Sequence, residues 1–392
     1  MSKAIRLRRM LTRTVAVVLA TAIVLLMAAG WYFAGQIRAG AFEVHPSEVE
    51  QDLRVVAASA DSITLAETGD RQGTLRTADT YGLAWDTGYG QVTGTPHAVG
   101  STVTRDFVLI DGTLPDPGQR AALDRNAFPA DDAELALPGY DVNEVTFPSP
   151  AGDFHAWFAP GRGRTWAILV HGQRATRTQM LRPMTASVAA GLPSLVIGYR
   201  NDAHEPPDPS HVYGFGQTEW PDLEAAVRYA RDNGADRVVL VGYSMGGAVV
   251  AAFLQHSDLN TLVSAVVLDS PMLNLSDTVD HQAAARSLPS PLTWTAKQLA
   301  AMRYDVHWDE LDYLADTSWV RTPTLIFHGT DDGTAPLADS RALARAHPEL
   351  VRLVPFRHAD HVASWNADPT RYDHAMVAFL RAHVPEADRA AP

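Results

Sequence analysis

The feature that most constrains the fold is a short apolar run that leads through a glycine-rich turn into an apolar helix. Residues 238–241 are Val-Val-Leu-Val, and residues 242–247, which follow directly, are Gly-Tyr-Ser-Met-Gly-Gly. Residues 248–254 are almost entirely apolar, which is typical of a helix that is buried on most of its faces. The sequence therefore predicts a strand, a sharp turn with Ser244 at its tip, and a helix.

This turn suits a reactive serine for physical reasons. A turn this sharp strains the backbone of Ser244, so the neighbouring Gly242 and Gly246 must lack side chains. The helix that begins at Met245 points its first amides at the serine, where they can stabilise a negative charge on an oxygen. We predict that Ser244 is a nucleophile; the alternative is an ordinary Gly/Ser turn.

Residues 139–385 alternate short apolar runs with helical segments. The apolar runs are residues 167–170, 195–197, 238–241, 266–268 and 324–327. Continuous apolar strands separated by helices predict an α/β fold, with an open, mostly parallel sheet covered by helices on both faces. Residues 273–322 interrupt the alternation with helical sequence that contains Trp294, Trp308 and Trp319. We expect this insertion to form a lid over the edge of the sheet.

A nucleophilic serine needs a base, and the base needs an acid that orients it. Residues 327–336 read Phe-His-Gly-Thr-Asp-Asp-Gly-Thr-Ala-Pro. This segment resembles the loop of α/β-hydrolases in which an Asp follows His-Gly by three places, and the resemblance implies that Asp332 is the acid. The adjacent Asp331 is one alternative. Asp269, at the end of another predicted strand, is a second.

The base is expected on a loop before the last helix, within residues 358–366, His-Ala-Asp-His-Val-Ala-Ser-Trp-Asn. α/β-hydrolases have Gly-His at this point, and the resemblance implies that His361 is the base, with Asp360 in the place of the glycine. His358 is the alternative. Three ligands crowded on one short loop, without a partner cluster elsewhere, make a zinc site improbable, so we expect neither a metal nor a cofactor.

The same resemblance implies an oxyanion hole formed by two backbone amides. One is the amide of Met245, directly after the serine, and the other is the amide of Gln173, directly after a His-Gly pair. His171 is then expected to hold the turn. Arg174 and Arg177 lie nearby and belong either to a solvated loop or to a contact with an anionic substrate group.

Two further segments are similar to membrane-associated α/β-hydrolases of the Bem46 type. They are residues 199–202, Tyr-Arg-Asn-Asp, and residues 218–220, Thr-Glu-Trp. The resemblance covers about residues 140 to 385. It implies an open sheet of about eight strands with the site at its C-terminal edge, but it implies no particular substrate.

The amino-terminal segment predicts a membrane anchor. Residues 14–34 contain no charge, and as a helix they would span about 31 Å, close to the thickness of the hydrocarbon layer. Residues 1–13 carry Lys and Arg, which favour the cytoplasmic side, and Trp31 and Tyr32 lie where aromatic residues favour the opposite interface. We expect a single span, with the residues after about Gly40 outside the cytoplasm.

A cleaved signal peptide is the alternative to an anchor. Small residues that could support cleavage occur at Ala28 and Gly30 and at Ala39 and Ala41. The apolar run is longer than the 7–15 residues or so of a usual signal peptide, which favours the uncleaved anchor.

Residues 45–138 predict a small β-rich subdomain next to the membrane. Residues 62–65 and 102–110 are β-like runs, and Gly, Asp and Pro separate such runs. This region contains no cluster of residues that suggests a chemical site, so we expect a structural or docking role.

Charge and cysteine content exclude several classes of function. The net charge is −13 although the first thirteen residues are basic, so the rest of the chain is strongly acidic and is not expected to bind nucleic acid. The chain has no cysteine, which excludes disulfides, thiolate metal sites and a cysteine nucleophile.

Together these patterns predict a membrane-anchored serine hydrolase that cleaves carboxylic esters, from a small-molecule or lipid-like acyl substrate, through an acyl-enzyme. A serine peptidase of the aminopeptidase or acyl-peptidase type is the nearest alternative, and an acyltransferase is another. A hydrolase-fold binding protein without catalysis is the remaining one. The sequence does not indicate an oligomeric state.

Overall fold

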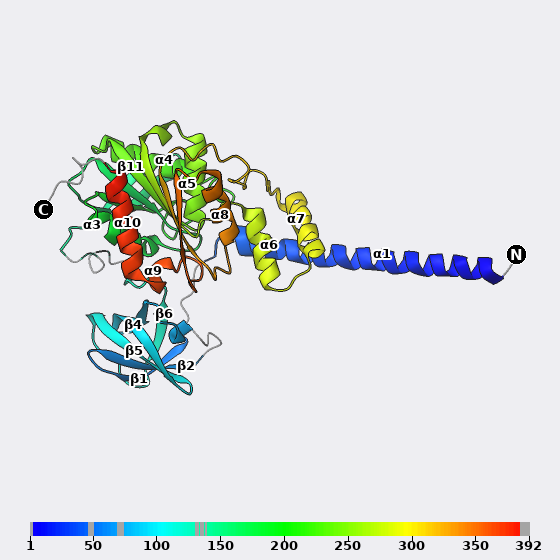
Figure 1. Cartoon of the computed structure of the whole chain (residues 1–392), viewed down its shortest axis with the longest axis horizontal. Helices are drawn as coiled ribbons and strands as arrows, with labels where there is room; N and C mark the ends of the chain where they lie inside the picture. The colour runs from blue at the N-terminus through cyan, green and yellow to red at the C-terminus, as the bar shows by residue number, and fades with distance from the viewer. Residues whose placement is uncertain are drawn as a thin grey trace.

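The computed structural model describes residues 3–45, 51–68, 74–129, 133, 137 and 139–384. It comprises a long N-terminal helix, a small β-barrel and a larger α/β unit (Figure 1). The boundary expected at residue 138 falls outside the described residues.

The α/β unit is built on an eight-stranded sheet with the order β14-β13-β12-β11-β9-β10-β8-β7. β8 runs antiparallel to both of its neighbours, and the pairs from β10 through β14 are parallel. This confirms the predicted open, mostly parallel sheet. The strands are β7 (Asn143–Ser149), β8 (Gly152–Ala159), β9 (Thr165–Val170), β10 (Ser194–Ile197), β11 (Arg237–Tyr243), β12 (Val263–Asp269), β13 (Thr324–Gly329) and β14 (Val351–Phe356).

Helices cover both faces of this sheet because consecutive strand residues point to opposite sides. In β11, Leu240 packs into the cluster that contains Phe253, whereas Val239 packs into the cluster that contains Tyr372. The first cluster includes residues of α4 (Trp220–Asp232), α5 (Met245–His256) and α8 (Leu337–Ala346), and the second includes α3 (Leu181–Ala189) and α10 (Pro369–His383). The sheet is therefore buried on both faces, as its apolar strands require.

The insertion after β12 is helical, as predicted, but its three tryptophans do not form one surface. Trp319 is buried in the core and Trp308 is half-buried, with its indole N–H donating to the carbonyl of Lys297. Trp294 is exposed. The lid itself consists of α6 (Leu275–Ala285) and α7 (Ser290–Tyr304).

The β-rich region is a closed barrel of antiparallel strands in the order β1-β2-β5-β4-β3-β6. Closure leaves no unpaired sheet edge, which stabilises a small all-β unit. Arg105 is buried in it and donates to the carbonyls of Leu75, Asp79 and Thr93. The strands are β1 (Leu53–Ala58), β2 (Ser62–Glu67), β3 (Tyr81–Trp85), β4 (Gly88–Val99), β5 (Thr102–Gly112) and β6 (Arg120–Asp124).

The barrel contacts the α/β unit through Asn366, in the short helix α9 (Ser364–Ala367). The side-chain amide of Asn366 donates to the backbone carbonyls of Thr80 and Arg125. Its backbone carbonyl accepts from the backbone amide of Thr80. Its side-chain oxygen accepts from Arg182 of α3. One buried side chain thus joins the two units close to the predicted base, His361.

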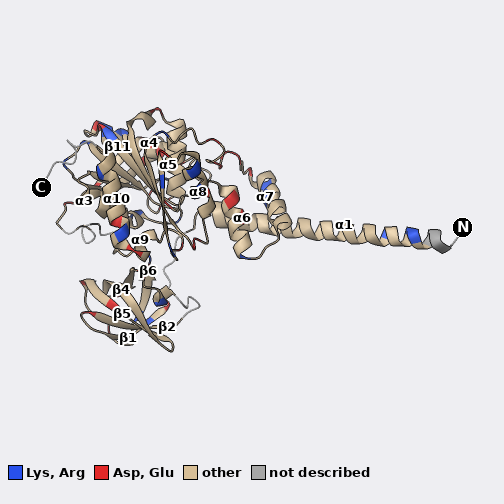
Figure 2. Ribbon diagram, in the orientation of Figure 1, with Lys and Arg blue, Asp and Glu red and all other residues tan. Residues whose placement is uncertain are grey.

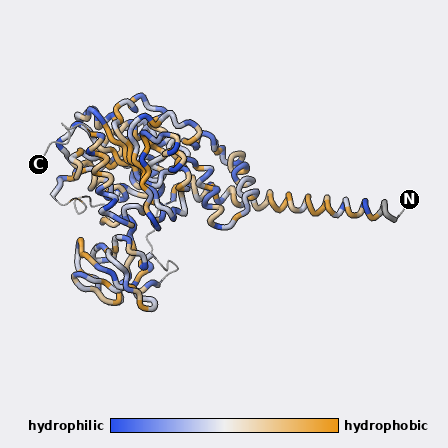
Figure 3. The backbone as a smooth tube through the Cα atoms, in the orientation of Figure 1, coloured by the Kyte–Doolittle hydropathy of each residue, from blue (hydrophilic) through white to orange (hydrophobic). Residues whose placement is uncertain are grey.

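The N-terminal helix α1 (Lys3–Ile37) continues as a short π-helix, Arg38–Phe42. The segment Leu7–Phe42 is long and apolar enough to cross a membrane. Figure 3 shows the apolar stretch projecting away from the α/β unit, and Figure 2 shows no Lys, Arg, Asp or Glu along its middle. The large apolar side chains from Val15 to Met27 are exposed, except that of Leu26, which is half-buried.

The end of α1 is part of the folded unit, which the sequence did not indicate. Ala34 is buried against Leu299 and Ala300 of α7. Phe42 is buried and its ring packs edge-on against Phe215, with 5.6 Å between ring centroids. The lid and the core therefore cover the last turns of this helix.

Candidate active site

Ser244 sits at the strained turn that the sequence predicts, between β11 and α5. Its φ of 52° and ψ of −118° lie outside the regions that side-chain-bearing residues normally adopt. A Cβ atom on Gly246 would lie 2.2 Å from the carbonyl oxygen of Val170, and one on Gly242 would lie 2.6 Å from that of Gly246. Both glycines are thus required by close backbone approach.

His361 lies between Ser244 and Asp332. Its Nε2 is 2.8 Å from Oγ of Ser244, and its Nδ1 is 2.9 Å from Oδ2 of Asp332. Because the carboxylate only accepts, the Nδ1 proton faces Asp332, and Nε2 is left to accept the serine proton. The structure thus brings together the three predicted side chains in the order that nucleophilic catalysis needs.

The carboxylate of Asp332 is held by several donors. It accepts from the amides of Thr334 and Ala335, and Nε2 of His328 lies 3.3 Å away. Burial raises the pKa of Asp332, but the hydrogen bonds and charges of His328 and His361 outweigh burial and hold it well below the usual value. Asp332 is therefore ionised and ready to stabilise a charged imidazole.

His328 was not singled out from the sequence. It is fully buried, with Nδ1 2.8 Å from Oγ of Ser340 and Nε2 3.2 Å from the carbonyl of Ala335. The sequence feature that could have identified it is its place in the His-Gly pair that precedes Asp332. His328 and His361 thus both lie within reach of Oδ2 of Asp332.

The two competing residues pair with each other away from the site. His358 Nδ1 is 3.2 Å from Oδ2 of Asp331, and both side chains are exposed. Neither has a hydrogen bond to Ser244, His361 or Asp332 among the described residues. The geometry therefore favours Asp332 and His361 over their neighbours.

Asp269, the third candidate acid, lies behind the site. Its Oδ1 accepts from Ser364 and is 3.3 Å from the hydroxyl of Ser270, and its backbone carbonyl accepts from the amide of Ser244. Burial raises its pKa to about 6. These contacts support the loop that carries His361 without reaching the imidazole.

Asp360, which replaces the glycine of the family pattern, has a structural explanation. Its carboxylate accepts from the amide of Gly333 and lies 3.4 Å from the guanidinium of Arg125, beside the barrel. Asp360 thus connects the loop that carries His361 to the loop that carries Asp332, and also to Arg125, which directly follows the last strand of the barrel.

The two predicted oxyanion donors flank the serine. Met245 is the first residue of α5. The backbone amides of the first turn of a helix have no hydrogen-bond acceptor within that helix. A Cβ atom on Gly172 would lie 3.0 Å from Cβ of Ser244, so the turn that carries Gln173 touches the serine. The side chain of Gln173 donates to the carbonyl of Ala41, at the end of the N-terminal helical segment.

His171 fixes this turn from behind. Its Nε2 is 2.8 Å from Oδ2 of Asp202 and its Nδ1 is 2.9 Å from the carbonyl of Gly172. Both nitrogens face acceptors, and only the doubly protonated imidazole can donate to both of them. Burial lowers the pKa of His171, but Asp202 and the carbonyl of Gly172 outweigh burial and raise it.

Residues 199–202 have a role that the sequence did not assign. The hydroxyl of Tyr199 donates to the carbonyls of His171 and Gly172, and its ring stacks on the imidazole at 4.4 Å. Oδ2 of Asp202 lies against Nε2 of the same imidazole and accepts from the backbone amide of Tyr199. The Tyr-Arg-Asn-Asp segment thus supports the oxyanion turn.

Arg174 and Arg177 are half-buried and make contacts that the sequence did not indicate, and Arg174 also lines a cavity next to Gln173. Arg174 donates to the carbonyls of Ala39 and Glu43, directly after α1. Arg177 pairs with Glu144 and stacks on Trp157. Both are structural ties.

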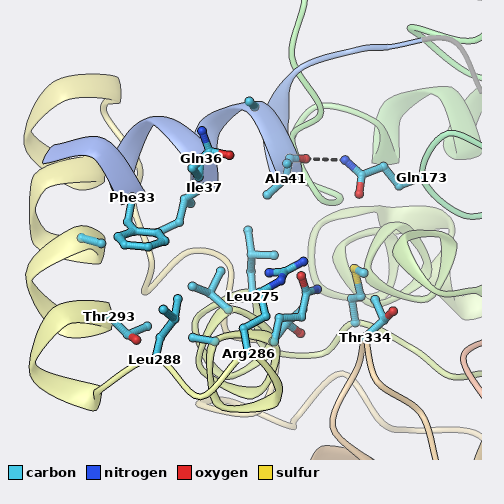
Figure 4. Close-up of a pocket in the computed structure, with 18 of the residues that line it drawn as sticks. Phe33, Gln36, Ile37, Ala41, Gln173, Leu275, Arg286, Leu288, Thr293 and Thr334 are labelled. Carbon is cyan, nitrogen blue, oxygen red and sulfur yellow. Dashed lines mark hydrogen bonds between the residues drawn. The ribbon is translucent and has the colours of Figure 1, made fainter. Parts of the chain in front are cut away.

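A cavity of about 760 Å³ lies beside the site, between the end of α1 and the lid. Figure 4 shows Gln173 and Thr334 at one end of it and Phe33 and Thr293 at the other. Within the part of the chain that the structure describes, no group of three or more His, Cys, Asp or Glu could hold a metal ion.

Comparisons with known proteins bear on the family and fold of the α/β unit. The sequence profile of the prolyl oligopeptidase (peptidase S9) family matches residues 213–386, a range that contains Ser244, Asp332 and His361. The uncharacterized protein YfhR of Salmonella typhimurium is 24% identical over 284 residues, covering 65% of this chain and 87% of that protein.

Among solved structures, an esterase of Pyrococcus furiosus is similar at a TM-score of 0.51 and 19% identity, covering 63% of this chain and 92% of that one. A second crystal form of the same esterase gives a TM-score of 0.50, covering 62% and 93%. The structural similarity establishes the fold of the α/β unit.

Proposed function

We propose that this chain, which is a serine hydrolase of the α/β-hydrolase superfamily, is a membrane-anchored esterase that cleaves carboxylic esters. The observation that carries the proposal is the continuous hydrogen-bonded path from Ser244 through His361 to Asp332. No step of the proposed reaction calls for a metal or an organic cofactor.

In the proposed reaction, His361 removes the proton of Ser244 as Oγ attacks the ester carbonyl. The amides of Met245 and Gln173 hold the oxyanion, and Asp332 stabilises the imidazolium. The imidazolium then returns the proton to the leaving alkoxide. Water, activated by the same histidine, releases the acid from the acyl-enzyme and restores the serine.

The membrane anchor is supported by the exposed apolar surface of α1 and by its packed end. Cleavage after Ala41 would remove Ala34, which is buried against Leu299 and Ala300, and cleavage after Gly30 would remove the glycine that lies against Thr295. The basic residues before α1 favour a cytoplasmic N-terminus and a catalytic unit outside the cytoplasm.

A serine peptidase is the second candidate, and the match to the prolyl oligopeptidase family favours it. The same three side chains cleave amides by the same steps, so the site geometry does not separate the two functions.

The two candidates differ in which leaving group they accept. We expect the purified full chain to hydrolyse p-nitrophenyl butyrate with a kcat/KM far above its values for aminoacyl, prolyl and acyl-peptide p-nitroanilides. Turnover of the anilides with little ester hydrolysis would move the function to a peptidase. The variant Ser244→Ala measures the background for both substrate classes.

A further inference from the structure

The walls of the cavity beside the site come from two parts of the chain that the sequence keeps far apart. One wall is formed by Tyr32, Phe33, Gln36 and Ile37, at the end of α1. The opposite wall is formed by the two lid helices and the loop between them. It includes Val279 and Ala283 of α6, Leu288 of the loop and Leu292 of α7. An anchor that served only to tether the protein would not contribute a wall to this cavity.

The inner end of the cavity reaches the neighbours of Ser244. Gln173 follows the glycine that touches the serine, and the amide of Met272 donates to the carbonyl of Ser244. The amide of Thr334 donates to Asp332. All three residues line the cavity, so a chain lying in it would end at the site.

The outer end of the cavity lies where α1 leaves the folded unit. Trp31 and Tyr32 of α1 and Trp294 of α7 are exposed there. Gly30 lies against Thr295, so the adjacent Trp294 is level with the last turns of the predicted span, residues 14–34. Amphipathic aromatics favour the bilayer interface, which places the cavity entrance at that surface.

The cavity is large enough for a long chain and its lining suits one. A volume of about 760 Å³ is within the range of sites that enclose drug-sized ligands. Aliphatic and aromatic side chains line both walls, together with polar side chains that include Arg174, Arg286 and Gln282, and among the described residues no Asp or Glu lines the cavity. The apolar side chains of the two walls favour a hydrocarbon chain between them.

We infer that this cavity binds the hydrocarbon chain of an ester drawn from the bilayer, with α1 serving as a wall of the substrate site as well as an anchor. This inference rests on the proposed esterase function and names its substrate class: long-chain esters presented by a membrane. Phe33 and Ile37 of the anchor then help to set the chain-length preference.

The first test compares two esters, with the full chain reconstituted in phosphatidylcholine nanodiscs. Val279→Trp and Ile37→Trp fill the cavity from opposite walls, whereas Ala284→Trp and Met27→Trp place the same ring on the same helices outside it. We expect the two filling variants to lower kcat/KM for p-nitrophenyl dodecanoate at least about tenfold, and that for the butyrate at most about twofold. The control variants change neither value.

Equal losses on both esters, or no loss on the dodecanoate, would overturn the inference while leaving the esterase function intact. If the wild-type chain hydrolyses neither ester, the proposed function fails on its own. The cavity is then tested by the second measurement.

The second measurement does not depend on turnover. A diazirine-bearing long-chain fatty acid is photo-cross-linked to the full chain carrying Ser244→Ala, and the labelled peptides are mapped by mass spectrometry. We expect labels on residues 32–37 and 279–292, and their loss in Val279→Trp. Labels confined to residues 15–27, which face lipid in any case, would contradict the inference.

Discussion

Gly30 of α1 and Thr295 of α7 are so close that a Cβ atom on the glycine would lie 2.6 Å from Cγ2 of the threonine. One turn later, Ala34 is buried against Leu299 and Ala300. Small residues one helical turn apart let two helices approach closely, as in membrane helix pairs. The contact makes the end of the anchor part of the lid.

Enlarging Gly30 should therefore separate α1 from α7. We expect Gly30→Leu to destabilise the full chain by about 1–3 kcal/mol, the usual cost of overpacking, and to lower its thermal unfolding temperature in detergent. Gly40→Leu is the matched control, because a Cβ atom there meets nothing within 4 Å. Equal unfolding temperatures for the two variants would mean that the α1–α7 contact is not formed.

The two histidines of the base-bearing loop make a direct comparison. His361→Ala removes the group that accepts the serine proton and should lower kcat/KM for p-nitrophenyl butyrate at least about a thousandfold. His358 is exposed and pairs only with Asp331 among the described residues, so His358→Ala should stay within about twofold of the wild type. The reverse result would exchange the base.

The three candidate acids should separate in the same assay. Asp332→Asn should lower kcat by about ten-thousandfold, because the imidazole then loses its orienting charge. Asp331→Asn should have little effect. Asp269→Asn keeps the backbone carbonyl that binds the Ser244 amide and should retain most of the activity. A large loss in Asp269→Asn with an active Asp332→Asn would reassign the acid.

The raised pKa of His171 predicts a pH-dependent stability. Its pKa is raised in the folded chain, so its contribution is complete below the unfolded value of about 6.5 and is lost as pH rises through the folded value. The thermal unfolding temperature of the wild type should therefore exceed that of His171→Gln by more at pH 6 than at pH 9. A gap between wild type and His171→Gln that widens with pH would contradict the assignment.

The strands and the turn at Ser244 were predictable because their signals are local. Continuous apolar runs and glycines at a sharp turn leave little choice of structure, and the predicted sheet is confirmed. Asp332 and His361 each lie on a loop a few residues after a strand, β13 and β14 respectively, and the family patterns keep these short distances along the chain. The structure places Asp332 within hydrogen-bond reach of His361, and His361 within reach of Ser244.

The remaining features depend on contacts between distant segments. Gly30 and Ala34 resemble ordinary residues of a membrane span, and nothing in α1 identifies α7 as its partner. The barrel meets the α/β unit through Asn366 and Thr80, which are far apart in sequence and have no pattern of their own. His328 precedes the acid by only four residues, but its buried contact with Asp332 appears only in three dimensions.

The most direct test of the proposed mechanism is the site of covalent labelling by a fluorophosphonate. The probe reacts with a serine only when a neighbouring base activates it. We predict a single adduct on Ser244 in the full chain, lost in Ser244→Ala and strongly slowed in His361→Ala. Labelling that persists unchanged in Ser244→Ala, or an adduct on another residue, would contradict the account.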